Sequence, residues 1–277
     1  APRWVIAGHA WPDPHATADV VIGDVGDALH RITAALAPRA AHPSWAATWR
    51  AADRAAVGAI ATALVSLALE RDAAELLEPA ALRSAISAAP PAAQLVLGNS
   101  LPIRLVDALC PGGGPYRRVL SQRGANGIYG LIAGAVGAAT LGPTLLVLGD
   151  VSFAHDAGAL AAARHARAPL AIVVIDNGGG RIFDQLPLAA SALPPGEFAR
   201  LWRTPPALDP VAVAQAFGCR GVCAPSGAAL ADAVADALER PGTTVIHVPV
   251  AAESAAIFRR AALAALAAES PAAGVER

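Results

Sequence analysis

The sequence has few charged residues and no cluster of basic ones. Asp, Glu, Lys and Arg make up 16% of the 277 residues, and the formal net charge is -1. Proteins that bind nucleic acids carry clustered Lys and Arg, whereas the basic runs here, such as Arg117-Arg118, are only two residues long. The composition therefore argues against a nucleic acid as partner.

Cysteine is also scarce. The three cysteines, Cys110, Cys219 and Cys223, are an odd number in a long chain, which does not suggest a disulfide framework. Cys219 and Cys223 lack further Cys or His residues at zinc-binding spacing, so we interpret them as small buried hydrophobic residues. A reducing, cytoplasmic compartment fits this pattern.

Neither a signal peptide nor a membrane span is expected. Residues 1–6 lack a basic region followed by an apolar core. Residues 128–149 carry no charge and are long enough to cross a bilayer, but Gly142-Pro143 divides them, so we predict a helix, a turn and a buried strand. The chain contains no methionine and starts at Ala1, which leaves open a longer polypeptide before it.

Short apolar segments alternate with helical ones along the chain. Hydrophobic residues make up 55% of the sequence, enough for a large core. We predict strands at 4–7, 20–22, 95–97, 119–121, 144–148, 170–175, 221–223 and 244–248. We predict helices at 25–36, 45–70, 79–88, 103–109, 128–139, 156–167 (with Asp156 as N-cap), 211–217 and 228–239, and a last Ala-rich helix. Continuous apolar strands between helices indicate an α/β fold, a parallel sheet with helices on both faces.

Polar residues follow the predicted strands at their carboxyl ends, where parallel sheets bind ligands. Asp150 comes directly after a buried strand and Gly149. Asn177 follows the next strand, 27 residues later, and three glycines come after it. Carboxylate, amide and carbonyl oxygens suit Mg²⁺ rather than zinc, and glycines let phosphates approach the backbone.

Each of these two loops alone is better explained by a helix cap or an ordinary turn. One crossover apart, they together favour a metal-diphosphate site. The three glycines are not a P-loop, because no Gly-Lys-Ser/Thr follows them.

The pattern from Gly149-Asp150 to Asn177 resembles the Gly-Asp-Gly…Asn motif of thiamine-diphosphate (ThDP) enzymes. Val151 stands at the third position, and this departure resembles one subgroup, the 2-succinyl-5-enolpyruvyl-6-hydroxy-3-cyclohexene-1-carboxylate (SEPHCHC) synthases of menaquinone biosynthesis. Four segments carry the resemblance: residues 98–104, 121–128, 149–156 and 177–183.

The resemblance implies a role for each matching residue. The implied ligands of Mg²⁺ (or Mn²⁺) are Asp150, Asn177 and the Gly179 carbonyl. The implied contacts of ThDP are Gly149, Val151, Ser152, Ile182 and Ile128, the last as the bulky residue that holds the cofactor bent. The implied substrate contacts are Ser100, Arg104, Arg123, Phe183 and Leu186, and the implied catalytic residues are Ile128, Arg104 and Arg123.

The implied reaction joins decarboxylated 2-oxoglutarate to isochorismate and gives SEPHCHC. Both substrates carry two carboxylates, which arginine binds through a planar pair of hydrogen bonds. The alternative for each of Arg104 and Arg123 is a role as a solvated surface residue or as the partner of an acid such as Asp107. Other 2-oxoacid decarboxylases, acetolactate-synthase-like subunits and a non-catalytic subunit that only holds Mg-ThDP remain alternatives.

The resemblance also implies a division of labour between domains. Residues 41–277 would form the diphosphate-binding domain, and residues 1–40 the tail of a middle domain. The activating glutamate of such enzymes belongs to a pyrimidine-binding domain, and Glu70, Glu75 and Glu78 fall on helical segments in the wrong place for that role. We therefore expect a partner chain or an N-terminal half, and a homo- or hetero-oligomer.

Overall fold

The computed structural model describes residues 3–9, 13, 15–36, 43–70, 75–110, 118–122, 128–190 and 194–269. Contacts within the chain divide it into two units, Ala1–Ala52 and Asp53–Arg277. The sequence places a domain boundary near residue 40, and its assignment of the first part to a middle domain stays a prediction.

The first unit contains two parallel strands and a helix. Strand β1 (Trp4–Ala7) pairs with β2 (Asp19–Ile22), and helix α1 (Val25–Ala35) follows. The Asp24 side chain accepts a hydrogen bond from the Asp27 backbone N–H and so caps the helix. Helix α2 (Pro43–Glu70) begins in this unit and continues into the second.

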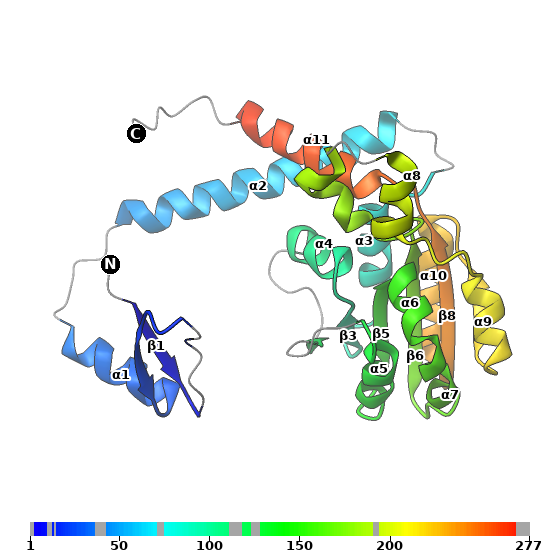
Figure 1. The fold of residues 1–277 in the computed structure, drawn as a ribbon, viewed down its shortest axis with the longest axis horizontal. Coiled ribbons are helices and arrows are strands. Elements are labelled where there is room, and N and C mark those ends of the chain that lie inside the picture. Colours follow the sequence, from blue (N-terminus) through cyan, green and yellow to red (C-terminus); the bar gives the residue numbers. More distant parts are fainter. Residues whose placement is uncertain are drawn as a thin grey trace. The chain divides into compact units, whose positions relative to one another are not determined.

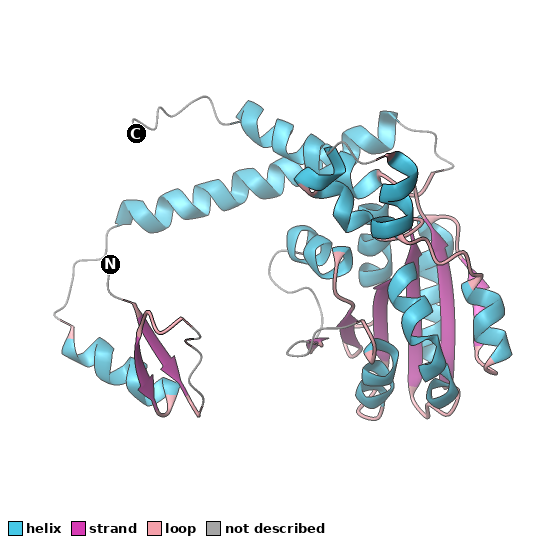
Figure 2. Ribbon diagram, viewed as in Figure 1, coloured by secondary structure: helices cyan, strands magenta, loops and turns pink. Residues whose placement is uncertain are grey.

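The second unit is built on a six-stranded sheet in which every neighbouring pair is parallel (Figure 2). Its strands are β3 (Gln94–Leu97), β4 (Val119–Ser121), β5 (Thr144–Gly149), β6 (Pro169–Asp176), β7 (Arg220–Cys223) and β8 (Gly242–Pro249). Their order across the sheet is β4-β3-β5-β6-β8-β7. The α/β fold expected from the sequence is confirmed.

Helices cover both faces of this sheet (Figure 1). The helices after α2 are α3 (Glu78–Ala88), α4 (Leu101–Leu109), α5 (Leu131–Ala139), α6 (Asp150–Asp156), α7 (Leu160–Ala163), α8 (Pro195–Phe198), α9 (Pro210–Ala216), α10 (Gly227–Glu239) and α11 (Ser254–Glu269). Short 3₁₀ or π turns are η1 (Ala157–Ala159), η2 (Arg181–Gln185), η3 (Pro187–Ala190) and η4 (Ala199–Arg203).

Two hydrophobic cores lie on opposite faces of the sheet, because successive strand residues point to opposite sides. Leu145 and Val147 pack into the core that α3, α4, α10 and α11 cover. Leu146 and Leu148 pack into the core that α5, α7 and α9 cover. Burial of both faces explains why the strands are apolar throughout rather than alternating.

The segment around Asp156 differs from the sequence prediction. The helix after β5 begins at Asp150 and ends at Asp156, so Asp156 is not the N-cap of a helix over 156–167. Its carboxylate instead accepts hydrogen bonds from the backbone N–H groups of Gly130 (2.9 Å) and Ile132 (2.6 Å). Asp156 therefore caps α5, which begins at Leu131 rather than Ile128 because Gly130 has a left-handed φ of 84°.

Helix α2 is long and apolar enough, by length and composition alone, to cross a membrane over Ser44–Leu69. A single helix of this kind is weak evidence, since core helices pass the same test. Ala63 and Leu67 of α2 are buried in the core beside α3, so we interpret the helix as part of the folded domain. Residues 128–149, the uncharged stretch of the sequence, form α5, a turn and β5 as predicted.

Candidate metal and diphosphate site

The candidate site lies where β5 and β6 end. These strands are neighbours in the sheet, with Gly149 opposite Ile175, as the sequence predicts. Asp150 starts α6 directly after β5, and Asn177 follows β6. Both side chains are buried, with 3% and 6% of their surfaces exposed. The parallel register therefore brings two polar side chains to one edge of an otherwise apolar sheet.

The Asp150 carboxylate joins the two loops. One oxygen accepts a hydrogen bond from the Gly179 backbone N–H (2.7 Å), and the other accepts one from the Val151 N–H (2.8 Å). Burial raises the pKa of Asp150 to about 6, although the hydrogen bonds from these N–H groups lower it. The nearby Asp176 carboxylate raises this pKa further. An ionised carboxylate in this position is poorly solvated, so a cation beside it would be favourable.

Asn177 carries a buried oxygen without a hydrogen-bond partner among the described residues. Its Nδ2 donates a hydrogen bond to Oε2 of Glu78 (2.9 Å), whereas its Oδ1 is buried and has no hydrogen-bond partner in the described part of the chain. Buried polar atoms without a partner are rare in folded proteins. A hard cation would satisfy this oxygen, so the residues present fit a magnesium ion.

The candidate metal site does not consist of several acidic, histidine or cysteine side chains. Among the described residues, no group of three or more His, Cys, Asp or Glu side chains is arranged to hold a metal. The candidate ligands are instead one carboxylate, one amide and one backbone carbonyl. Magnesium commonly takes few protein ligands and completes its sphere with phosphate oxygens and water.

Glu78 is a residue of the site that the sequence pattern does not indicate. It begins α3, is 1% exposed and contacts Asn177 from a position 99 residues earlier. Burial raises the pKa of Glu78 to about 7, although the hydrogen bond from Asn177 lowers it. The Asp150 charge raises this pKa further. An acid in the apolar run Leu76-Leu77-Glu78-Pro79 is the only local signal of its burial.

The turn after Asn177 requires glycine. Gly178 and Gly179 have φ of 76° and 117°, which other residues rarely adopt. A Cβ on Gly179 would also collide with the carbonyl oxygen of Arg203. Asp176 closes the turn, since it accepts hydrogen bonds from the Gly178 N–H (3.1 Å) and from His247 (2.9 Å), and the His247 bond lowers the pKa of Asp176.

Of the other predicted cofactor residues, two lie on α6 and one lies before α5. Val151 and Ser152 lie in the first turn of α6, and Ser152 is buried. Ile128 is half-buried and precedes α5 instead of belonging to it. Arg123 lies outside the described residues, so its substrate and catalytic role stays a prediction.

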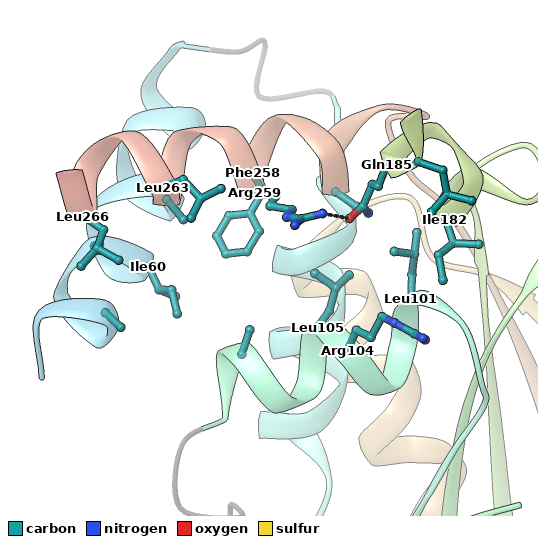
Figure 3. Close-up of a pocket in the computed structure, with 16 residues that line it drawn as sticks. Ile60, Leu101, Arg104, Leu105, Ile182, Gln185, Phe258, Arg259, Leu263 and Leu266 are labelled. Atoms are coloured by element: carbon teal, nitrogen blue, oxygen red, sulfur yellow. Dashed lines mark hydrogen bonds between the residues drawn. The ribbon is translucent and has the colours of Figure 1, made fainter. Parts of the chain in front are cut away.

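A cavity of about 580 Å³ lies between α2, α4, α11 and η2 (Figure 3). Of the predicted residues, Arg104, Ile182 and Leu186 line it, whereas Asp150, Asn177 and Phe183 do not. Apart from Arg104, its polar lining residues are Gln185 and Arg259, which are hydrogen-bonded to each other (3.1 Å). Arg259 is a second guanidinium that sequence reasoning did not single out.

Ser100 and Phe183 have local roles of their own. The Ser100 carbonyl accepts a hydrogen bond from Arg104 (2.7 Å), and Ser100 has a φ of 75°, a strained conformation for a residue with a side chain. The Phe183 ring packs edge-on against Trp202, with ring centroids 5.3 Å apart.

Comparisons with known proteins point in one direction. The family of thiamine pyrophosphate enzymes, C-terminal TPP binding domain, matches residues 115–248. The SEPHCHC synthase of Sorangium cellulosum is 39% identical over 90% of this chain and 41% of its own length. The synthase of Shewanella amazonensis is 36% identical over 88% of this chain and 40% of its own length.

Among solved structures, a putative thiamin diphosphate-dependent enzyme from Mycobacterium smegmatis superposes with a TM-score of 0.61 at 22% identity, over 90% of this chain and 44% of that one. This likeness supports the fold. The chain spans about 41% of the Sorangium relative's length. Residues 115–248 therefore match the C-terminal TPP binding domain of thiamine pyrophosphate enzymes, and most of the chain is similar to about 40% of the length of SEPHCHC synthases.

Proposed function

We propose that this chain holds Mg-ThDP at the ends of β5 and β6, as the diphosphate-binding part of a SEPHCHC synthase. The observation that carries the proposal is the buried Asn177 Oδ1, which lacks a partner next to the buried Asp150 carboxylate. Asp150, Asn177 and the Gly179 carbonyl would hold Mg²⁺ or Mn²⁺. Gly149, Val151 and Ser152 would contact the diphosphate.

When bound, ThDP supplies the electron sink for decarboxylation and carbon–carbon bond formation. The chain's own residues would bind the cofactor and orient it. Ile128 and Ile182 would pack against the cofactor and exclude water from it. The proposed substrates are 2-oxoglutarate and isochorismate, as the resemblance implies.

The cavity between α2, α4, α11 and η2 supports acidic substrates. Its lining is mostly aliphatic, with the Arg104 and Arg259 guanidiniums as its cationic groups. Arginine forms charge-assisted hydrogen bonds with carboxylates, and its planar fork suits them. Arg104, with Ser100 and the undescribed Arg123, would therefore orient substrate carboxylates along the apolar wall of Leu186 and Phe183.

A second polypeptide segment is part of the proposal. The activating glutamate would come from a pyrimidine-binding domain, supplied by an N-terminal half or a partner chain in a homo- or hetero-oligomer, in the cytoplasm. Glu78 does not fill that role, because its carboxylate is 1% exposed and is hydrogen-bonded to Asn177 at the diphosphate corner.

The test begins with ThDP titrated calorimetrically into the chain, with Mg²⁺ and with EDTA. We expect binding only with Mg²⁺, and its loss in Asp150→Ala but not in Asp209→Ala, which removes a carboxylate from the exposed start of α9. Equal binding with EDTA, or by Asp150→Ala, would contradict the metal assignment.

The second stage adds a pyrimidine-domain chain and compares substrates. We expect isochorismate to be consumed together with 2-oxoglutarate. Consumption of pyruvate instead would favour an acetolactate-synthase-like subunit or another 2-oxoacid decarboxylase. Mg-dependent binding without turnover of any of these substrates would favour a non-catalytic ThDP-binding subunit.

A further inference from the structure

The Glu78–Asn177 contact is a buried interaction between a carboxylate and the amide proposed to bind the metal. It joins the first residue of α3 to the loop after β6 across 99 residues of sequence. Glu78 is 1% exposed and Asn177 is 6% exposed. Burying a carboxylate is costly unless the group has a specific partner. The burial of Glu78 therefore needs a structural or functional reason.

The orientation of the Asn177 amide decides what it can bind. An asparagine side chain has an oxygen that accepts hydrogen bonds or binds cations, and an NH₂ group that does neither. Oε2 of Glu78 accepts from the NH₂ end, which leaves Oδ1 without a hydrogen-bond partner among the described residues. The opposite orientation would set two acceptors against each other and turn the NH₂ group toward the proposed metal position.

We propose that Glu78 is a positioning residue that orients Asn177 so that its amide oxygen binds the metal. This inference rests on the proposed function. Glu78 acts through Asn177, because its carboxylate is hydrogen-bonded to the NH₂ end of that amide. Partners of metal ligands fix ligand orientation in this way in many metal sites.

The backbone around Glu78 is held at several points. Its N–H donates to Oγ of Ser254 (3.0 Å), which in turn donates to the Ala251 carbonyl (2.7 Å). The Ala251 N–H donates to the Leu76 carbonyl (2.9 Å), and the Val250 N–H donates to the Asp176 carbonyl (2.9 Å). These bonds connect the starts of α3 and α11 with the ends of β6 and β8, and the Ala251–Leu76 and Val250–Asp176 bonds do not depend on the Ser254 hydroxyl.

Three variants separate orientation of the amide from general stability. Glu78→Leu removes the acceptor but keeps a buried side chain of similar size. Glu78→Gln keeps an oxygen that can accept from Nδ2 of Asn177. Ser254→Ala is the matched control, because it breaks a buried hydrogen bond to the backbone of the same residue and leaves the carboxylate in place. Circular dichroism establishes that each variant is folded.

The first readout is Mg²⁺-dependent ThDP affinity, measured by calorimetry. We expect Glu78→Leu to weaken it by about 10- to 100-fold, the usual effect of losing the partner of a metal ligand. Glu78→Gln should recover most of the affinity, and Ser254→Ala should leave it nearly unchanged. Unaltered affinity in Glu78→Leu, or an equal loss in Ser254→Ala, would overturn the proposal.

The second readout needs neither metal nor turnover. The side-chain NH₂ resonances of Asn177, assigned by their loss in Asn177→Asp, report the hydrogen bond in the metal-free chain. We expect them to shift in Glu78→Leu and to stay in place in Ser254→Ala; no shift in Glu78→Leu would overturn the inference. If the unaltered chain failed to bind ThDP with Mg²⁺, the proposed function would fail separately, and the metal-positioning role with it.

Discussion

At the scale of single residues, the candidate site concentrates negative charge in a poorly solvated corner. Glu78 and Asp150 are buried, and the half-buried Asp176 lies next to Asp150. Backbone N–H groups and His247 compensate part of this charge. A divalent cation would compensate the rest. The free-energy cost of burying these carboxylates without a metal is therefore consistent with the proposed binding of Mg²⁺.

This cost predicts how the stability of the metal-free chain depends on pH. Burial raises the pKa of Glu78 from 4.5 to about 7, so the folded chain binds this proton more tightly than the unfolded chain. Stability is therefore lost as pH rises from about 4.5 through 7, by about 3 kcal/mol when complete. The raised pKa of Asp150, about 6, acts in the same direction.

Urea unfolding in EDTA between pH 5 and 8 measures the effect. We expect the free energy of unfolding to fall across this range, and to fall less in Glu78→Gln, which has no proton to lose at that position. The same slope in both chains would show that Glu78 keeps its ordinary pKa and would contradict the burial argument.

At the scale of elements, Asp156 links the α6 loop to the segment that carries Ile128. Its carboxylate, at the end of α6, accepts hydrogen bonds from Gly130 and Ile132 at the start of α5. Ile128 lies two residues before Gly130. We therefore expect this cap to hold the proposed cofactor-packing residue in place as well as to stabilise the helix.

Asp156→Ala should lower the free energy of unfolding by about 1–2 kcal/mol, the usual cost of losing an N-cap, and should also weaken ThDP binding. Asp209→Ala is the control, because Asp209 caps α9 by accepting from Val211 (2.8 Å) and Ala212 (3.3 Å). It should lower stability by about 1 kcal/mol without changing ThDP affinity. Chemical denaturation would measure the stability of both variants, and calorimetry their ThDP affinity. Equal ThDP affinities of Asp156→Ala and Asp209→Ala would contradict the link to Ile128.

The elements themselves were largely predictable from sequence, and their exact starts were not. The strands of the sheet are short continuous apolar runs, which is what burial on both faces requires. The start of α5 was misplaced because its cap comes from Asp156, 24 residues after Ile132. A local pattern contains no trace of such a partner, so Asp156 was interpreted as the cap of its own helix.

At the scale of the whole molecule, sequence predicts the site where neighbouring strands build it and misses what distant segments add. Asp150 and Asn177 were found because the ends of adjacent parallel strands meet at one edge. Glu78 and Arg259 were missed because their contacts, with Asn177 and Gln185, span 99 and 74 residues.

The most direct test of the account is the position of the metal. Crystals of the chain grown with ThDP and Mn²⁺ in place of Mg²⁺ would locate the ion by its anomalous scattering. We predict one peak within coordination distance of the Asp150 carboxylate, the Asn177 amide oxygen and the Gly179 carbonyl, next to the diphosphate. Bound ThDP with the manganese peak elsewhere, or with the NH₂ end of Asn177 facing the ion, would contradict it.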